Sequence, residues 1–248
     1  MSKMAVIIVA AGSGKRFGGN ESKIFAKLDN QPLFLRAVQL FVNRDDVSQT
    51  ILVVAPSELE QMKSKFGANL GFMGVKLVGG GAERHDSVAN GLAAVNDDAE
   101  FIAVHDAARV CIAYEWIGTI FAAAIKTGAA VPVIPVTSTL KRMAPDKTLS
   151  ETVLRDGLFM AQTPQIFRAD VLKAAYAGLD DIKLHEGKPI TDDAQLVSAS
   201  GFPVTAVEGD SRNIKITTRG DLTLAGAILK CLPQKPISRG GVFEEARW

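Results

Sequence analysis

The stretch AVIIVA at residues 5–10, followed at once by AGSGKR at residues 11–16, decides the fold of this chain. Six consecutive small or branched apolar residues predict a strand that is buried on both faces, as parallel strands are when helices cover a sheet. The glycines that follow indicate a tight connection out of the strand. The two stretches together predict an α/β fold whose first loop carries positive charge.

Strands and helices are expected to alternate along the rest of the chain. Short apolar runs predict further strands at residues 50–55, 75–78, 101–104 and 129–136. Apolar residues at helical spacing predict helices at residues 31–42, 86–95 and 115–126. Ser57, with Glu60 three residues later, is typical of a capping box that opens another helix. This order predicts a doubly wound, mainly parallel, Rossmann-like sheet, in which ligands bind beyond the carboxyl ends of the strands.

One polar segment, residues 137–155, interrupts this alternation. It contains a turn signal, Pro-Asp-Lys at residues 145–147, and is interpreted as a β-arm that protrudes from the sheet at about residues 137–158. The remaining pattern predicts a single domain over residues 1–232. Residues 233–248 carry two glycines in a row and two prolines, and are predicted to form a C-terminal extension.

Charge and composition exclude several classes of partner. The chain has 28 Lys and Arg against 27 Asp and Glu in 248 residues. That balance supports neither a nucleic-acid footprint over the whole surface nor a polybasic membrane anchor, so no nucleic-acid or membrane partner is expected. The apolar stretch at residues 5–11 is too short to cross a membrane and lacks a signal-peptide cleavage site. Cys111 and Cys231 are interpreted as reduced thiols. We therefore expect a cytoplasmic protein.

The first loop is a candidate phosphate-binding element, because glycine lets backbone N–H groups approach an anion. A dinucleotide fingerprint would need glycine where Phe17 stands, and a P-loop would need Ser or Thr where Arg16 stands. What remains is a glycine turn with its own cations, Lys15, Arg16 and Lys23, which suit a triphosphate. A plain turn with solvated cations explains the spacing equally well.

A set of motifs then follows in order over about residues 4–225. They are AAGxGxR at 10–16, GGAERHDSVANGL at 80–92, VHDAAR at 104–109, TLK at 139–141, Arg155, QTPQIF at 162–167, TDDA at 191–194, and EG followed by NIKIT at 208–217. The set resembles the signature of the 2-C-methyl-D-erythritol 4-phosphate cytidylyltransferases. The resemblance implies a nucleotidyltransferase of the non-mevalonate isoprenoid pathway that joins CTP to that sugar-alcohol phosphate. It would give 4-diphosphocytidyl-2-C-methyl-D-erythritol and pyrophosphate.

Two alternatives to this function are kept. Ribitol-5-phosphate cytidylyltransferases share nearly all of these motifs and would use another acceptor. A nucleotide-binding regulator of the same fold without turnover is the alternative of a different class.

The resemblance also assigns the catalytic cations. The barrier is repulsion between two anions and growth of charge on the α-phosphate, so cations and positioning should supply most of the catalysis. Arg16 and Lys23 are implied to hold the triphosphate and the transition state. Lys215, expected on a strand at residues 213–216, is implied to contact the α-phosphate and the incoming phosphate. An exposed strand lysine is the simpler interpretation of Lys215.

Asp106 follows an apolar strand and is the candidate ligand for Mg²⁺, the expected cofactor; it could instead bond the ribose hydroxyls. It would also serve as a helix N-cap. His105 is expected to turn inward as a packed side chain without a catalytic role. Arg109 is expected to brace either the glycine loop or Asp106.

The expected CTP site surrounds the first loop. Glycine at 80 and 81 would let the base approach closely, although a simple turn before a helix has the same sequence. The residues expected to bind CTP are Ala10, Ala11, Gly12, Gly14, Gly80, Gly81, Arg84, Ser87 and Arg109.

The acceptor site is implied by resemblance alone. It would use Thr139, Arg155, Thr163 and Thr191. In the family the arm swaps around a partner, which implies a homodimer whose active sites each mix residues of two chains.

Overall fold

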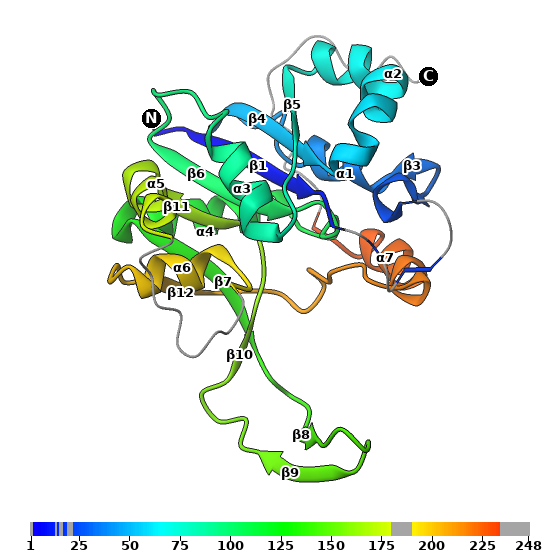
Figure 1. Cartoon of the computed structure of the whole chain (residues 1–248), viewed down its shortest axis with the longest axis vertical. Coiled ribbons are helices and arrows are strands. Elements are labelled where there is room, and N and C mark those ends of the chain that lie inside the picture. Colours follow the sequence, from blue (N-terminus) through cyan, green and yellow to red (C-terminus); the bar gives the residue numbers. More distant parts are fainter. Residues whose placement is uncertain (1, 13, 15–16, 19–21, 180–189, 234–248) are drawn as a thin grey trace.

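The computed structural model describes residues 2–12, 14, 17–18, 22–179 and 190–233. Within these residues one sheet of eight strands runs through the molecule in the order β10-β7-β11-β6-β1-β4-β5, with β12 paired to β7 (Figure 1). The strands are β1 (Met4–Ala10), β4 (Val47–Val54), β5 (Val75–Gly79), β6 (Phe101–Asp106), β7 (Ala129–Pro135), β10 (Phe159–Ala161), β11 (Gln165–Arg168) and β12 (Thr205–Glu208).

The sheet is mainly parallel, as the sequence predicts. β1 pairs in parallel with β4 and β6, β4 with β5, and β7 with β12. The exceptions are β11, which lies antiparallel between β6 and β7, and β10, which pairs antiparallel with the end of β7. The carboxyl ends of β1, β4 and β6 therefore meet at one edge, and that edge carries the first loop and Asp106.

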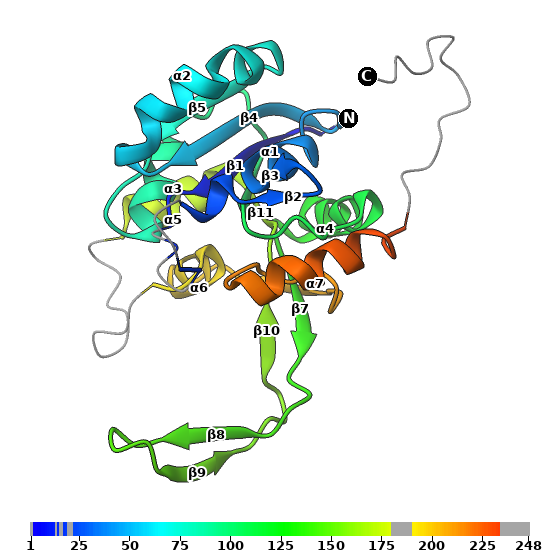
Figure 2. The same ribbon diagram turned by 90° about the vertical axis from the view of Figure 1, so that its right-hand side faces the viewer.

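Helices cover both faces of the sheet, as Figure 2 shows from the side. They are α1 (Leu33–Gln39), α2 (Pro56–Phe72), α3 (Arg84–Leu92), α4 (Tyr114–Thr127), α5 (Ala169–Ala177), α6 (Asp193–Ala199) and α7 (Arg219–Leu229), with a short 3-10 helix η1 (Lys23–Phe25) after the first loop. Alternate residues of β1 enter two separate cores: Val6 and Ile8 pack toward α1, α2, α4 and α7, and Ile7 packs toward α3, α5 and α6. The doubly wound prediction is confirmed.

Several helix starts differ from the sequence prediction by one or two residues, and two of them have a clear cause. Residues 31 and 32 pair as β3 (Gln31–Pro32) with β2 (Lys27–Leu28), so the helix expected from residue 31 begins at Leu33. The predicted Ser57–Glu60 capping box is wrong, because α2 begins one residue earlier with Pro56 in its first turn. Proline there has no N–H to leave unpaired and is preset to a helical φ.

The protruding arm is confirmed. Between β7 and β10 the chain leaves the body and forms a hairpin of β8 (Leu140–Met143) and β9 (Leu149–Val153), seen below the sheet in Figures 1 and 2. The Ala144 N–H donates to the Thr148 carbonyl at 2.9 Å and closes the turn over the Pro-Asp-Lys signal. Of the predicted C-terminal extension only Pro233 is among the described residues. No helix of the described chain combines the length and apolarity needed to cross a membrane.

Candidate active site

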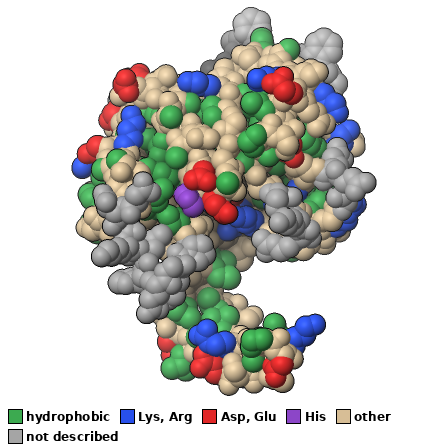
Figure 3. All heavy atoms as spheres, in the orientation of Figure 1, with side chains coloured by type: hydrophobic (Ala, Val, Ile, Leu, Met, Phe, Trp, Pro, Cys, Tyr) green, Lys and Arg blue, Asp and Glu red, His purple; other side chains and the backbone are tan. Residues whose placement is uncertain are grey.

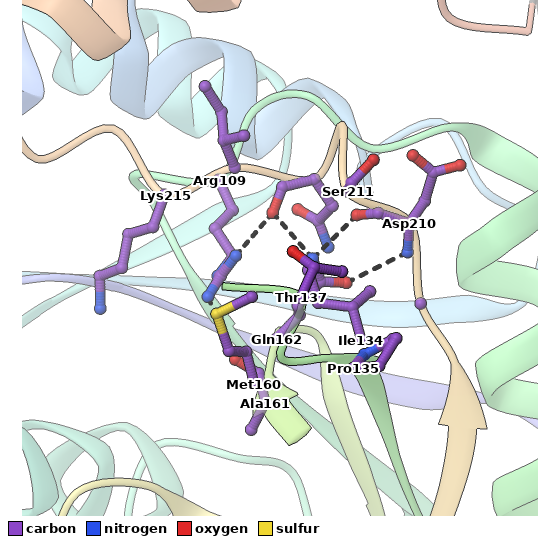
Figure 4. A pocket seen from close by; sticks show the side chains of 13 residues that line it. Arg109, Ile134, Pro135, Thr137, Met160, Ala161, Gln162, Asp210, Ser211 and Lys215 are labelled. Carbon is purple, nitrogen blue, oxygen red and sulfur yellow. Dashed lines mark hydrogen bonds between the residues drawn. The ribbon is translucent and has the colours of Figure 1, made fainter. Parts of the chain in front are cut away.

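Two cavities lie where the first loop, the end of β6 and the base of the arm come together. The loop cavity, about 520 Å³, is lined by Ala10, Ala11, Gly12, Lys23, Gly81, Arg84, Ser87 and Asp106, among others. The arm-base cavity, about 670 Å³, is lined by Arg109, Thr137, Gln162 and residues 209–211 and 213–214 (Figure 4). Lys215 lines both cavities. The space-filling view in Figure 3 shows Lys and Arg side chains gathered in the hollow between the body and the arm.

Asp106 is the central charge of this region. It is the last residue of β6 and is 7% exposed. The Lys215 Nζ lies 2.6 Å from its Oδ2, the Arg84 Nε 3.5 Å from its Oδ1, and the Arg109 Nε 4.0 Å from its Oδ2. Burial alone would raise the pKa of the Asp106 carboxyl, but these cations hold that pKa well below its usual range. The carboxylate is therefore ionised at neutral pH.

The helix N-cap alternative for Asp106 is wrong. The next helix, α4, begins at Tyr114 with Ala113 as its N-cap. Asp106 instead lines the loop cavity, with its carboxylate among the three cations.

Arg84 is held by a second carboxylate that the sequence analysis did not assign. Its Nη2 lies 2.8 Å from Oδ2 of Asp193, a fully buried residue at the start of α6. Tyr176 of α5 donates its hydroxyl to the other Asp193 oxygen at 2.6 Å. Although burial lowers the pKa of Arg84, the two carboxylates raise it overall above its ordinary value. A charged Asp193 in the TDDA motif was a usable signal, whereas a lone Tyr176 in an apolar helix carried none.

Lys215 does not lie on a strand, and that prediction is wrong. Residues 213–217 form no regular strand. Their backbone groups form hydrogen bonds with residues around the site and do not pair with a neighbouring strand. The Ile216 N–H donates to the Ala108 carbonyl at 2.9 Å, and the Lys23 Nζ donates to the Ile216 carbonyl at 3.0 Å. Although the Lys215 side chain is 41% exposed, its ion pair with Asp106 rules out a merely solvated lysine.

The glycines before α3 are needed by the protein's own packing. A Cβ at Gly80 would lie 2.7 Å from the Ala11 Cβ, and one at Gly81 would lie 2.2 Å from the Asp86 Cβ. Neighbouring residues therefore occupy the space that a side chain at either position would need, while Gly81 still lines the loop cavity. Ser87 fastens the turn, because its Oγ accepts from the Gly81 N–H at 3.1 Å and donates to the Glu83 carbonyl at 3.1 Å.

The first loop is described only in part. Ala10, Ala11 and Gly12 line the loop cavity as expected, but Gly14 and Gly80 are not among its lining residues. Gly14 has a φ of 60° and accepts a 2.8 Å hydrogen bond from the Phe17 N–H, so it shapes the turn. Arg16 lies outside the described residues.

Thr163 and Arg109 are displaced from their expected roles. Thr163 is buried and lines neither cavity. Its Oγ1 accepts a hydrogen bond from the Asp106 N–H at 3.0 Å. Arg109 lines the arm-base cavity instead of the loop cavity, and its Nη1 donates to the Asn213 carbonyl at 2.6 Å. Of its two expected partners it approaches Asp106, with its Nε 4.0 Å from Oδ2.

The other expected acceptor residues are not brought to the site within one chain. Thr139 and Arg155 are exposed on the arm, where Arg155 donates to the Thr137 carbonyl. Thr191 is exposed, and its hydroxyl donates to Gln195 Oε1 at 3.0 Å. These three residues line neither the loop cavity nor the arm-base cavity.

An ionised carboxylate among three cations, beside a loop of small residues at the end of a parallel strand, places the chain among the nucleotidyltransferases. A family model described as 2-C-methyl-D-erythritol 4-phosphate cytidylyltransferase matches residues 4–231. The chain therefore belongs to that family, and the resemblance found in the motifs is confirmed.

Individual relatives agree with this assignment. The chain is 44% identical over 232 residues to the 2-C-methyl-D-erythritol 4-phosphate cytidylyltransferase of Endomicrobium trichonymphae, covering 92% of this chain and 99% of that one. It is 39% identical over 229 residues to the protein of the same name from Alkaliphilus metalliredigens, covering 92% and 93%. The crystal structure of that cytidylyltransferase from Thermus thermophilus is similar with a TM-score of 0.74 at 31% identity, covering 93% of this chain and all of the other.

Proposed function

We propose that this chain transfers the cytidylyl group of CTP to the phosphate of 2-C-methyl-D-erythritol 4-phosphate and releases pyrophosphate. The observation that carries the proposal is the position of Lys215. Its Nζ lies 2.6 Å from the Asp106 carboxylate, and the residue lines both the loop cavity and the arm-base cavity. A cation between two cavities is placed to bridge the two anions that must react.

The loop cavity would hold the nucleotide. Lys23 and Arg84 supply positive charge on its walls. Residues 10–12, at the end of β1, also line this cavity. Arg16 is assigned to the triphosphate by the family resemblance. Phosphates that enter here meet cations already in position, so little reorganisation accompanies the growth of charge in the transition state.

The arm-base cavity would hold the acceptor, with its phosphate directed toward Lys215 and Arg109. An oxygen of that phosphate attacks the α-phosphorus of CTP, and the bond from this phosphorus to the bridging oxygen breaks. The electron pair leaves with pyrophosphate, and no proton transfer is required. Lys215 neutralises part of the repulsion between the two phosphates, which is the main barrier to the attack.

Mg²⁺ is proposed as the metal. Magnesium in phosphate chemistry is usually held by one or two carboxylates together with substrate oxygens. Asp106 fits that need, because its carboxylate is ionised and lines the loop cavity. The described residues contain no cluster of three metal-ligating side chains that would hold an ion without a substrate. When bound, the ion would neutralise charge on the triphosphate.

We further propose a homodimer built by the arm. Apolar side chains are exposed along it, namely Met143, Leu149, Leu154, Leu158, Phe159 and Met160. A second copy that covers them would bury surface that is costly to leave in water. It would also bring Arg155 and Thr139 to the partner's arm-base cavity.

Pyrophosphate release tests the proposal. With Mg²⁺, CTP and 2-C-methyl-D-erythritol 4-phosphate we expect turnover, and with ribitol 5-phosphate or UTP we expect kcat/KM to fall by at least about tenfold, a difference of about 1.4 kcal/mol. Equal rates with the two acceptors would contradict the substrate assignment. Absence of turnover with every combination would favour the non-catalytic regulator.

A further inference from the structure

We propose that His105 is a positioning residue, whose imidazole closes a ring of hydrogen bonds that holds Asp106, Arg109 and the segment carrying Lys215 in one arrangement. The proposal rests on the proposed function, since it concerns the geometry of that reaction. His105 lies on β6, is fully buried as the sequence analysis expected, and packs edge-on against Phe41 with ring centroids 5.0 Å apart.

The donors and acceptors around the ring are determined by their partners. The His105 Nε2 lies 2.8 Å from the Arg109 carbonyl oxygen, which can only accept, so Nε2 carries the hydrogen. Thr163 Oγ1 accepts the Asp106 N–H at 3.0 Å and lies 3.2 Å from the His105 Nδ1. With the hydrogen of a neutral imidazole on Nε2, Nδ1 is an acceptor, and the threonine hydrogen points to it.

This ring extends to the catalytic lysine. The Arg109 Nη1 donates to the Asn213 carbonyl at 2.6 Å, and the Asn213 Nδ2 donates to the Thr163 carbonyl at 3.0 Å. Asn213 is 2% exposed and stands two residues before Lys215. Thr163 thus holds Asp106 through its hydroxyl and the lysine segment through its carbonyl, while His105 fixes the direction of that hydroxyl.

The geometry predicts a catalytic effect that is larger than the effect on folding. Without His105 the Thr163 hydroxyl can rotate, and the Arg109 carbonyl loses a buried partner. Asp106 and Lys215 would then be free to shift relative to each other. A misplacement of about 1 Å can cost about 10²-fold in rate, even when substrate binding is intact.

Substitutions at His105 test the ring. His105→Phe keeps an aromatic ring but removes both hydrogen bonds, and we expect kcat to fall about 10²-fold with KM for CTP changed less than about twofold. His105→Asn retains an acceptor near Nδ1 and His105→Gln a donor near Nε2, so both should fall between wild type and His105→Phe. Thr50→Val, a buried polar position on β4 in the same sheet, is the control and should leave kcat within about twofold.

A double substitution separates positioning from general loss of stability. Because the Nδ1 side of His105 acts only through Thr163, His105→Gln, which keeps a donor for the Arg109 carbonyl, combined with Thr163→Val should be no slower than the slower single variant. Rate losses that multiply would overturn the proposal. So would a His105→Phe protein that melts at a lower temperature but retains the wild-type kcat.

A spectroscopic measurement applies even if the variants fail to fold. In the ¹⁵N-labelled wild-type protein we expect the His105 imidazole to show one protonated nitrogen, Nε2, with slow hydrogen exchange. A protonated Nδ1 would overturn the hydrogen-bond ring. If the wild-type protein shows no turnover, the proposed function fails, and the imidazole spectrum alone then decides whether the ring exists.

Discussion

Arg155 and Lys215 are expected to serve one active site from two different subunits. Arg155 lies on the exposed arm, whereas Lys215 lies against Asp106 in the body of its own chain. Arg155→Ala and Lys215→Ala homodimers should each be nearly inactive, since every site of either dimer lacks one of the two cations.

Mixing the two variants should restore activity by an amount that follows from the arrangement. A heterodimer has one site with both lesions and one site with neither. Random pairing makes half of the dimers mixed, and each of them has one intact site of two, so recovery reaches about a quarter of wild-type activity.

The assay is pyrophosphate release after co-refolding the two variants in equal amounts, with heterodimers confirmed by mass. Arg168→Ala serves as the control, because Arg168 is exposed and paired with Asp170 at 2.6 Å on the body. Mixing Arg168→Ala with Lys215→Ala should give activity in proportion to the sites that keep Lys215. No site regains activity from a residue of the partner subunit in this mixture. If confirmed heterodimers of the first pair remain inactive, Arg155 acts within its own subunit or the two sites are not independent.

Three other perturbations have defined outcomes. Lys23→Ala should lower kcat by about 10²–10³, the scale of deleting one transition-state donor, whereas a normal kcat with a raised KM for CTP would mean ground-state binding. Asp193→Asn should raise KM for CTP, because Arg84 loses the 2.8 Å partner that orients it, and Asp170→Asn should not; steady-state kinetics on both variants decides. Hydrogen bonds from Thr217 and Thr218 lower the pKa of Asp221 from 3.8 to about 2, so its stabilisation of α7 is complete above pH 4 and is lost as the pH falls toward 2. The difference in unfolding free energy between wild type and Asp221→Ala should shrink over that window, and a difference independent of pH would contradict this.

Most of the fold could be predicted from the sequence, because the patterns that indicate its strands and helices are local. Residues 5–10 form a buried strand by composition alone, and Gly128 ends α4 with a φ of 87°, a backbone conformation that glycine adopts without strain. The arm was visible because a polar segment with a turn signal has no place in a buried sheet. Errors arose at helix starts, where Pro56 outweighed the Ser57 capping pattern.

The contacts within the site could be predicted less well from the sequence, since they join residues that are remote along the chain. Asp106 and Lys215 were both predicted, but their 2.6 Å ion pair depends on a segment that looked like a strand and is irregular. Thr163 looked like a substrate ligand, because a motif does not reveal that its hydroxyl already accepts the Asp106 N–H. Tyr176 lacked any signal, because its role exists only through Asp193.

The described cations of the site share one property that bears on how it binds phosphates. Each is already held by an acceptor of the protein: Lys215 by Asp106, Lys23 by the Ile216 carbonyl, Arg84 by Asp193 and Arg109 by the Asn213 carbonyl. Positive charge that is partly buried is costly unless it is paired, and these partners reduce that cost while keeping the side chains in place. Lys215 pairs at 2.6 Å with Asp106, the candidate metal ligand, whereas Arg84 lies closer to Asp193, at 2.8 Å, than to Asp106, at 3.5 Å. Under the proposed function Asp106 would hold the metal and Lys215 would contact the phosphate, so the ion pair between the two residues would open when both ligands are bound. Arg84 would keep its contact with Asp193 in that exchange, because Asp193 is fully buried.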